Sequence, residues 1–185
     1  MAVKFTVSEN GVLKKAELVD QSGFTLNHGV RGIRDEDFDI SIITDAVIPD
    51  GVTHIGDGAF AGCDWLSGVV IPESVTNIGN RAFYDCYSLA AITIPAGVTS
   101  IGVDLFADCN NLESVSILGK ITCIGERVFA WCESLTNVII PESVTSIDEK
   151  TFYGCGAGLI IRAPAGSYAE RYALKNGIKF EAFNI

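Results

Sequence analysis

The chain of 185 residues is 48% hydrophobic and 19% charged, a composition that excludes a disordered or fibrous protein. Its length suffices for one domain with a substantial core. The longest apolar stretches, such as Val69–Ile71 and Val138–Ile140, are far too short to cross a bilayer. The hydrophobic residues are therefore spread over many short segments, which is typical of a stack of short strands.

The net charge of −10 is unevenly distributed along the chain. Between Asp35 and Glu149 there are 18 acidic residues and 3 basic residues, the latter being Arg81, Lys120 and Arg127. Nucleic acids and anionic membrane surfaces need a basic protein face. The acidic central part therefore argues against both as partners, and we expect no membrane insertion.

Residues 1–25 are predicted to form an N-terminal cap built on a β-hairpin. Asn10-Gly11 lies between the apolar residues Phe5 and Val12, and this dipeptide favours a tight turn between two strands. The first nine residues show no basic segment followed by an apolar one, so no signal peptide is visible. This leaves the compartment open between the cell interior and an exported protein whose leader is not part of this sequence.

A 23-residue repeat dominates the chain from residue 48 onward. One unit reads I-P-x-x-V-T-x-I-G-x-x-A-F-x-x-C-x-x-L-x-x-V/I-x. The phenylalanines at this step are Phe60, Phe83, Phe106, Phe129 and Phe152. A degenerate segment from Leu26 to Phe38 aligns with the unit at an offset of 22. We therefore predict six units, 26–47, 48–70, 71–93, 94–116, 117–139 and 140–162.

Each unit is predicted to combine two short extended segments with one or two helical turns. The apolar and polar residues that end at Ile71 alternate with period two, as in a strand. Phe83 and Cys86 follow Ile78 at offsets of 5 and 8, which fits helical turns that face inward. One unit cannot bury its own apolar side. Stacking in register, with strands about 4.8 Å apart, should create a continuous core and a parallel sheet on one face.

Residues 163–185 are predicted to form a C-terminal helical cap. Ser167 and Glu170 are spaced as a capping box, so a helix should begin near Tyr168. Asn176-Gly177 provides a left-handed end for this helix. Its apolar side would cover the open end of the core, and that side comprises Ala169, Tyr172 and Ala173. Caps and units together then make one structural domain.

The unit motif I-P-x-x-V-T-x-I-G-x-x-A-F-x-x-C resembles the BspA-like class of leucine-rich repeats over about residues 26–185. The tail from Ala163 to Phe180 looks like the C-terminal cap of that family, and Phe5 to Leu13 resembles the hairpin that often precedes such arrays. The resemblance implies a leucine-rich-repeat solenoid, a right-handed β/α superhelix. It also implies a protein that is displayed on a bacterial surface or secreted, and that serves adhesion and protein–protein contact.

Five cysteines recur at the repeat step and form what we term the cysteine ladder, namely Cys63, Cys86, Cys109, Cys132 and Cys155. Zinc sites need close pairs such as C-x-x-C, and no such pair is present. Stacked cysteines with parallel Cβ directions are poorly aimed for a disulfide. We expect buried, reduced thiols that pack as small hydrophobic groups against loop backbone. Cys123 lies outside the ladder and should be the most reactive thiol.

No catalytic set can be assembled from the remaining residues. His28 and His54 occupy non-equivalent repeat positions, and nothing completes a nucleophile–base–orienter arrangement. The run from Asp35 to Asp39 lacks the spacing and the glycine of a calcium loop, and it suits the start of a helical turn. We therefore expect no enzyme activity, no metal site and no cofactor.

Positions that differ between units are the candidates for binding a partner. On the strand face, one outward row is small and almost uncharged, and it includes Val70, Thr93, Ser116 and Ile139. Around the cysteine turns, a second set of off-register aromatic residues comprises Trp65, Tyr84, Tyr87, Trp131 and Tyr153. Exposed aromatic side chains often anchor interfaces. The alternative is that they pack on neighbouring turns as spacers.

These features favour a non-catalytic protein-binding module of a bacterial surface or secreted protein, engaged in cell adhesion or protein–protein interaction. The alternative is a structural spacer that self-associates. The expected cellular location rests on the family resemblance, because no targeting signal is visible in the sequence. The strand face is expected to be smooth, and its small, uncharged residues do not indicate which protein binds.

Overall fold

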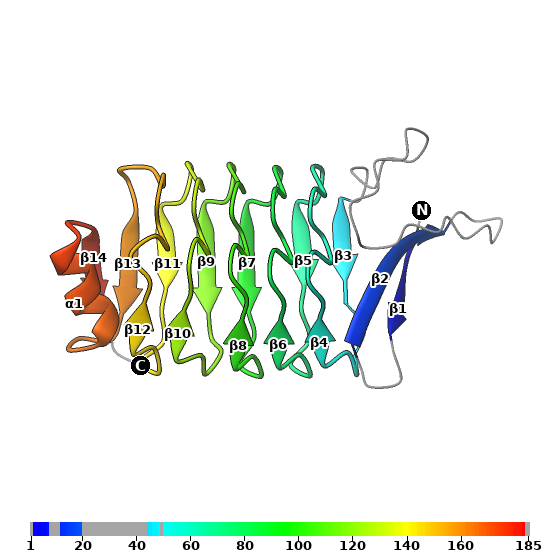
Figure 1. Ribbon diagram of the computed structural model, residues 1–185, viewed down its shortest axis with the longest axis horizontal. Helices are drawn as coiled ribbons and strands as arrows, with labels where there is room; N and C mark the ends of the chain where they lie inside the picture. Colours follow the sequence, from blue (N-terminus) through cyan, green and yellow to red (C-terminus); the bar gives the residue numbers. More distant parts are fainter. Residues whose placement is uncertain (1, 8–11, 20–43, 49, 184–185) are drawn as a thin grey trace.

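The computed structural model describes residues 2–7, 12–19, 44–48 and 50–183. These residues form an elongated stack of coils with a hairpin at one end and a helix at the other (Figure 1). The first face carries β3 (Asp45–Val47), β5 (Gly68–Val70), β7 (Ala91–Ile94), β9 (Ser114–Ile117), β11 (Asn137–Ile139) and β13 (Ile160–Ala163). The second face carries β4 (His54–Ile55), β6 (Asn77–Ile78), β8 (Ser100–Ile101), β10 (Cys123–Ile124) and β12 (Ser146–Ile147).

Neighbouring coils pair in parallel at a shift of 23 residues. On the first face Val138 is level with Val115 and with Ile161, and on the second face Ile78 is level with Ile55. The predicted stacking in register is therefore confirmed. The expectation of a parallel sheet on one face is too narrow, because the second extended segments also pair between coils.

The segment between the second strand and the cysteine is not helical, contrary to the prediction from its apolar spacing. Arg81 and Asp85 have φ angles of 54° and 55°, and left-handed residues cannot continue a right-handed helix. The N–H of Phe60 instead donates to the carbonyl of Ala82 on the next coil, at 2.7 Å. The backbone of this segment pairs from coil to coil, as strands do. In the described coils the β part of the expected β/α unit is present, and the helical part is replaced by turns.

The centre of the stack is a column of phenylalanine rings, which we term the phenylalanine ladder. Successive ring centroids lie 5.1, 5.6, 5.7 and 5.3 Å apart, with interplanar angles of 3–13°. Its members are Phe60, Phe83, Phe106, Phe129 and Phe152, and all are buried. Isoleucine, leucine and valine at the same repeat step surround the rings. The apolar side chains of all described coils therefore merge into one continuous core.

Both faces are interrupted once within the described coils. β7 pairs with β9 and not with β5, and β10 pairs with β12 and not with β8. Between the first two coils the N–H of Ile48 donates to the carbonyl of Val70 at 3.0 Å. Among the described residues, the equivalent hydrogen bond from the N–H of Ile71 to the carbonyl of Thr93 is absent. The sheet of the first face is thus split between β5 and β7.

The N-terminal hairpin consists of β1 (Ala2–Val7) and β2 (Val12–Val19), which pair antiparallel. β2 then runs parallel to β4, with Val12 level with His54, so the hairpin extends the second face. The Asn10-Gly11 turn and residues 26–43 of the degenerate first unit lie outside the described residues. The exact boundaries of that unit stay predictions.

At the other end, α1 (Tyr168–Lys175) begins where the capping pattern predicts. The hydroxyl of Ser167 accepts a hydrogen bond from the N–H of Glu170 at 3.2 Å. The ring of Tyr172 lies 6.1 Å from that of Phe152, so the helix covers the end of the phenylalanine ladder. β14 (Lys179–Ala182) then pairs in parallel with β13, a strand that the sequence analysis did not predict.

Replacing a central ring should destabilise the whole array. Phe106 is fully buried between Phe83 and Phe129, so Phe106→Ala should lower the free energy of unfolding by about 3–5 kcal/mol, measured by urea denaturation. Tyr87→Ala is the matched control, because that ring is 52% exposed and its loss should change stability by less than about 0.5 kcal/mol. Equal losses in the two variants would contradict the role given to the ladder.

Candidate partner-binding surfaces

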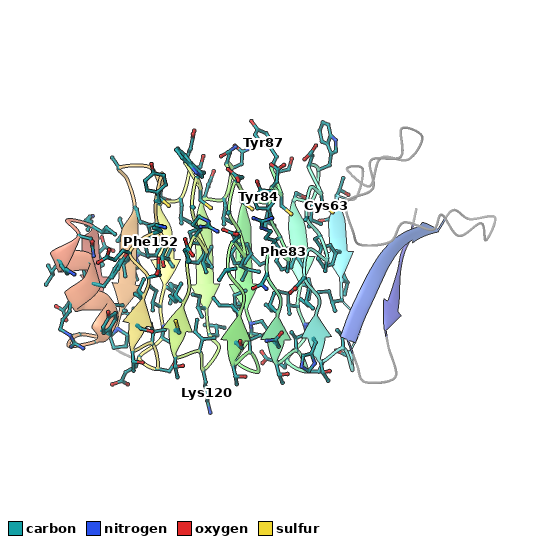
Figure 2. All side chains as sticks on the ribbon, viewed as in Figure 1. Cys63, Phe83, Tyr84, Tyr87, Lys120 and Phe152 are labelled. Atoms are coloured by element: carbon teal, nitrogen blue, oxygen red, sulfur yellow. The ribbon has the colours of Figure 1, made fainter. Side chains whose placement is uncertain are left out.

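The off-register aromatic residues share one long edge of the stack, which we term the aromatic edge and define as Trp65, Tyr84, Tyr87, Trp131 and Tyr153. Each lies in the turn that surrounds a ladder cysteine. Figure 2 shows Tyr84 and Tyr87 at this edge near Cys63, with Lys120 at the opposite edge. The repeat register therefore brings residues from four coils, 88 positions apart at the extremes, onto one side of the molecule.

Four of these rings are substantially exposed. Trp65 is 60% exposed, Tyr87 52%, Trp131 46% and Tyr153 59%. Tyr84 is half-buried. Soluble proteins bury most of their large aromatic surface, and rings that stay accessible beside one another mark interaction sites. The aromatic edge is therefore a candidate surface for binding a partner.

Packing fixes three of these rings, and two of them, Trp131 and Tyr153, stay exposed. The rings of Trp131 and Tyr153 meet edge to face, with centroids 5.2 Å apart and an interplanar angle of 89°. Trp131 also lies over Gly154, where any Cβ would come within 2.5 Å of the indole. The guanidinium of Arg81 lies 5.4 Å above the ring of Tyr84. Trp131 and Tyr153 therefore act as packed spacers and as exposed surface at once.

The cysteine ladder supports this edge from beneath. The thiols of Cys86, Cys109, Cys132 and Cys155 each donate to a phenylalanine carbonyl of the preceding coils, at 3.0–3.1 Å. The predicted contact between thiol and loop backbone is thus confirmed, and all six cysteines are free. Burial raises the pKa of the Cys63 and Cys155 thiols to about 12 and raises that of Cys132 as well.

An ion-paired column runs beside the edge. Asp104 is 3% exposed and lies between two arginines of the adjacent coils. Its carboxylate accepts from Nε of Arg81 at 3.1 Å, and from Nε and Nη2 of Arg127 at 2.6 and 3.1 Å. The hydrogen bond from Arg127, above all, lowers the pKa of Asp104. These three residues have φ angles of 53–54°, so their side chains offset part of the cost of a left-handed backbone.

The strand face contains a shallow groove of about 550 Å³ where the sheet is split between β5 and β7. Val70, Thr93 and Ser116 of the predicted outward row line it, whereas Ile139 lies beyond it. Val69, in a column whose other described members are buried, is partly accessible here. The sequence analysis predicted a smooth face and missed this groove. Both strands keep an apolar residue in the core column, Val69 and Ile92, so the pattern of apolar residues gives no signal for the split.

The histidines and acidic residues considered in the sequence analysis form no catalytic or metal site among the described residues. The ring nitrogen Nδ1 of His54 lies 2.8 Å from the hydroxyl of Thr53. His28 and the acidic run from Asp35 to Asp39 lie outside the described residues. Among the described residues no group of three or more histidine, cysteine or acidic side chains is placed to hold a metal ion. None of the helices in that part of the chain has the length and apolarity to cross a membrane.

The repeat matches a known protein family. Six copies of the BspA type leucine rich repeat region match residues 31–157, more than half of the chain. The chain belongs to the BspA-type leucine-rich repeat family. The resemblance seen in the unit motif is confirmed, and proteins with this repeat are generally non-catalytic and bind other proteins. Comparison with curated protein sequences gives no match.

Several bacterial leucine-rich repeat structures share the fold. A leucine-rich repeat protein of T. pallidum is 28% identical with a TM-score of 0.66, over 86% of this chain and 68% of that one. The pneumococcal vaccine antigen PcpA is 18% identical with a TM-score of 0.61, over 77% of this chain and 36% of that one. A leucine-rich repeat protein of Bacteroides ovatus is 23% identical with a TM-score of 0.50, over 89% and 54%. This chain spans only about a third to two thirds of these longer chains.

Thiol labelling should separate Cys123 from the ladder. Cys123 is exposed, whereas Cys63, Cys86, Cys109 and Cys132 are buried and Cys155 is partly buried, and burial raises the pKa of Cys63, Cys132 and Cys155. We expect one fast-reacting thiol per native chain at pH 8 with an aromatic disulfide reagent, and six after denaturation. Cys123→Ser should abolish the fast phase. Two or more thiols reacting at the same fast rate would contradict the burial of the ladder.

Asp104→Asn should weaken the array in a pH-dependent way. Asparagine keeps the shape and tolerates a left-handed backbone, but it loses the charge that both arginines bind. The loss at pH 7 should be about 1.5–3 kcal/mol of unfolding free energy. Because the folded pKa of Asp104 is lowered, its contribution is present above the unfolded value of about 3.9 and disappears as the pH falls through the folded value. A loss that stays constant from pH 7 to pH 3 would contradict this account.

Proposed function

We propose that the chain is a non-catalytic protein-binding module whose partner docks on the aromatic edge. The observation that carries the proposal is the set of four accessible rings held on one edge by a rigid stack. Tryptophan and tyrosine supply large contact areas at low entropic cost, and they are the residues that most often dominate binding energy. The family context, in which repeats of this type bind proteins, supports the same conclusion.

We place this activity in adhesion or protein–protein contact by a bacterial surface or secreted protein. The support is the BspA-type repeat, whose resemblance implies display outside the cell. The strongly acidic central part of the chain also keeps such a module away from nucleic acid and anionic membranes.

The direct test begins with affinity capture by the whole chain from its native environment, followed by mass spectrometry. The captured partner is then titrated against the native chain and against a Trp65→Ala/Tyr87→Ala variant. These two rings are 60% and 52% exposed, so their removal should leave the melting temperature unchanged. Loss of interface hot spots should weaken the affinity by about tenfold or more.

A matched variant on the other surface, Thr93→Ala/Ser116→Ala, shortens side chains that line the strand-face groove. We expect it to bind as the native chain does. Weakening confined to this variant would move the site to the groove and overturn the proposed edge. Light scattering over a concentration range tests the spacer alternative, because self-association without any captured partner would favour an assembly element.

A further inference from the structure

We infer that the aromatic edge takes a cationic partner segment, an extended stretch of chain that carries arginine or lysine side chains. This inference rests on the proposed function and specifies the chemistry of the partner at the same surface. It follows from the charges that accompany the accessible rings, from their spacing, and from one cation–aromatic contact already present at the edge.

All fixed charges of the five cysteine turns are negative. Residues 61–66, 84–89, 107–112, 130–135 and 153–158 contain Asp64, Asp85, Asp108 and Glu133, and no lysine or arginine. Asp64, Asp85 and Glu133 are exposed, and Asp108 is half-buried. Asp108 is hydrogen-bonded by the side chain of Tyr84, but an anionic or neutral partner would leave the negative charges of all four carboxylates uncompensated. A cationic partner satisfies both groups at once.

Among the described residues, no lysine or arginine forms an ion pair with Asp64, Asp85, Asp108 or Glu133. Burial raises the pKa of Asp85, and the nearby charges of Asp64 and Asp108 raise it further, as expected for stacked carboxylates that repel one another. Of the arginines in the described coils, Arg81 and Arg127 both bind Asp104. A cation brought by a partner would therefore relieve repulsion that the folded chain retains.

The aromatic side chains suit the same ligand. Arginine stacks on aromatic faces and pairs with carboxylates through the same planar group. Within this chain, the guanidinium of Arg81 already lies 5.4 Å above the ring of Tyr84. The faces of Trp65 and Tyr87, which are 60% and 52% exposed, offer this contact to an external side chain.

The spacing fits an extended segment. Trp65 and Trp131 are three coils apart, and the coil steps measured along the phenylalanine ladder are 5.1, 5.6 and 5.7 Å. They are therefore separated by about 16 Å along the stack, which about five residues of extended chain can span at roughly 3.3 Å each. One such segment spans the four coils that carry Trp65, Tyr87 and Trp131 together with the four carboxylates.

The opposite edge isolates the contribution of the rings. It carries Asp50, Glu73 and Glu142 together with Lys120, and its turns contain no aromatic residue. Charge alone is therefore present at both edges, whereas charge combined with accessible rings is confined to the aromatic edge among the described turns. A cationic segment should prefer the latter.

The probe is a short synthetic peptide in which arginine alternates with serine, fluorescently labelled and titrated against the whole native chain at low and at near-physiological salt. Lysine and glutamine replace arginine in two comparison peptides. We expect the affinity to decrease from the arginine peptide to the lysine peptide, and we expect no measurable binding of the glutamine peptide. Affinity should fall as salt rises, because exposed charges are screened.

Two matched variants locate the binding. Asp64→Asn/Asp85→Asn removes two charges from the aromatic edge, and asparagine tolerates the left-handed backbone at position 85. Glu73→Gln/Glu142→Gln removes two charges from the opposite edge. We expect the first variant to bind the arginine peptide about tenfold more weakly and the second to change it by less than about twofold. Trp65→Ala/Tyr87→Ala should weaken it as the first variant does.

Equal weakening in both charge variants, no change in the first, or tight binding of the glutamine peptide would each overturn the inference. Failure here is separable from failure of the proposed function. A captured partner that needs Trp65 and Tyr87 while the arginine peptide does not bind would leave the protein-binding module standing and remove the cationic segment. If the arginine peptide binds at the aromatic edge while the captured partner binds equally well without Trp65 and Tyr87, the partner docks elsewhere and the proposed function fails.

Discussion

The structure depends on one constraint: every coil must repeat the last at the spacing at which aromatic rings and peptide groups both stack. Ring centroids 5.1–5.7 Å apart and parallel backbone hydrogen bonds impose that spacing together. Apolar residues at the 23-residue step are thereby placed in the core, and the ladder thiols donate to carbonyls of the preceding coils. The surface that we propose for partner binding is instead made of exposed side chains that differ from coil to coil.

Sequence periodicity predicted the core because identical residues at identical steps can satisfy burial only by stacking. It failed at the turn between Ile78 and Cys86, where apolar offsets of 5 and 8 fit a helix equally well. The signal against a helix was present in equivalent positions of other units: Gly58, Gly62 and Gly154 occupy the columns of the left-handed Arg81 and Asp85. The split between β5 and β7 left no such signal, since it changes hydrogen bonding without changing the pattern of core residues.

The sequence predicted which residues make up the candidate site, but it did not predict their exposure or their contacts. That the five aromatic residues share an edge follows from the repeat register alone. Their exposure, the edge-to-face contact of Trp131 with Tyr153, and the capture of Arg81 and Arg127 by Asp104 depend on side-chain packing that periodicity does not encode. The last of these bears on the proposed partner, because among the described residues it engages Arg81 and Arg127 with Asp104 and not with the acidic residues of the edge.

The central claim is that the register residues hold the fold while the aromatic edge binds the partner. Hydrogen exchange of the chain with and without its captured partner tests this most directly. The account predicts that the partner protects the backbone amides of residues 61–66 and 84–89 and leaves the exchange of β7 and β9 unchanged. Protection confined to β5, β7 and β9 would place the partner in the strand-face groove and contradict the account.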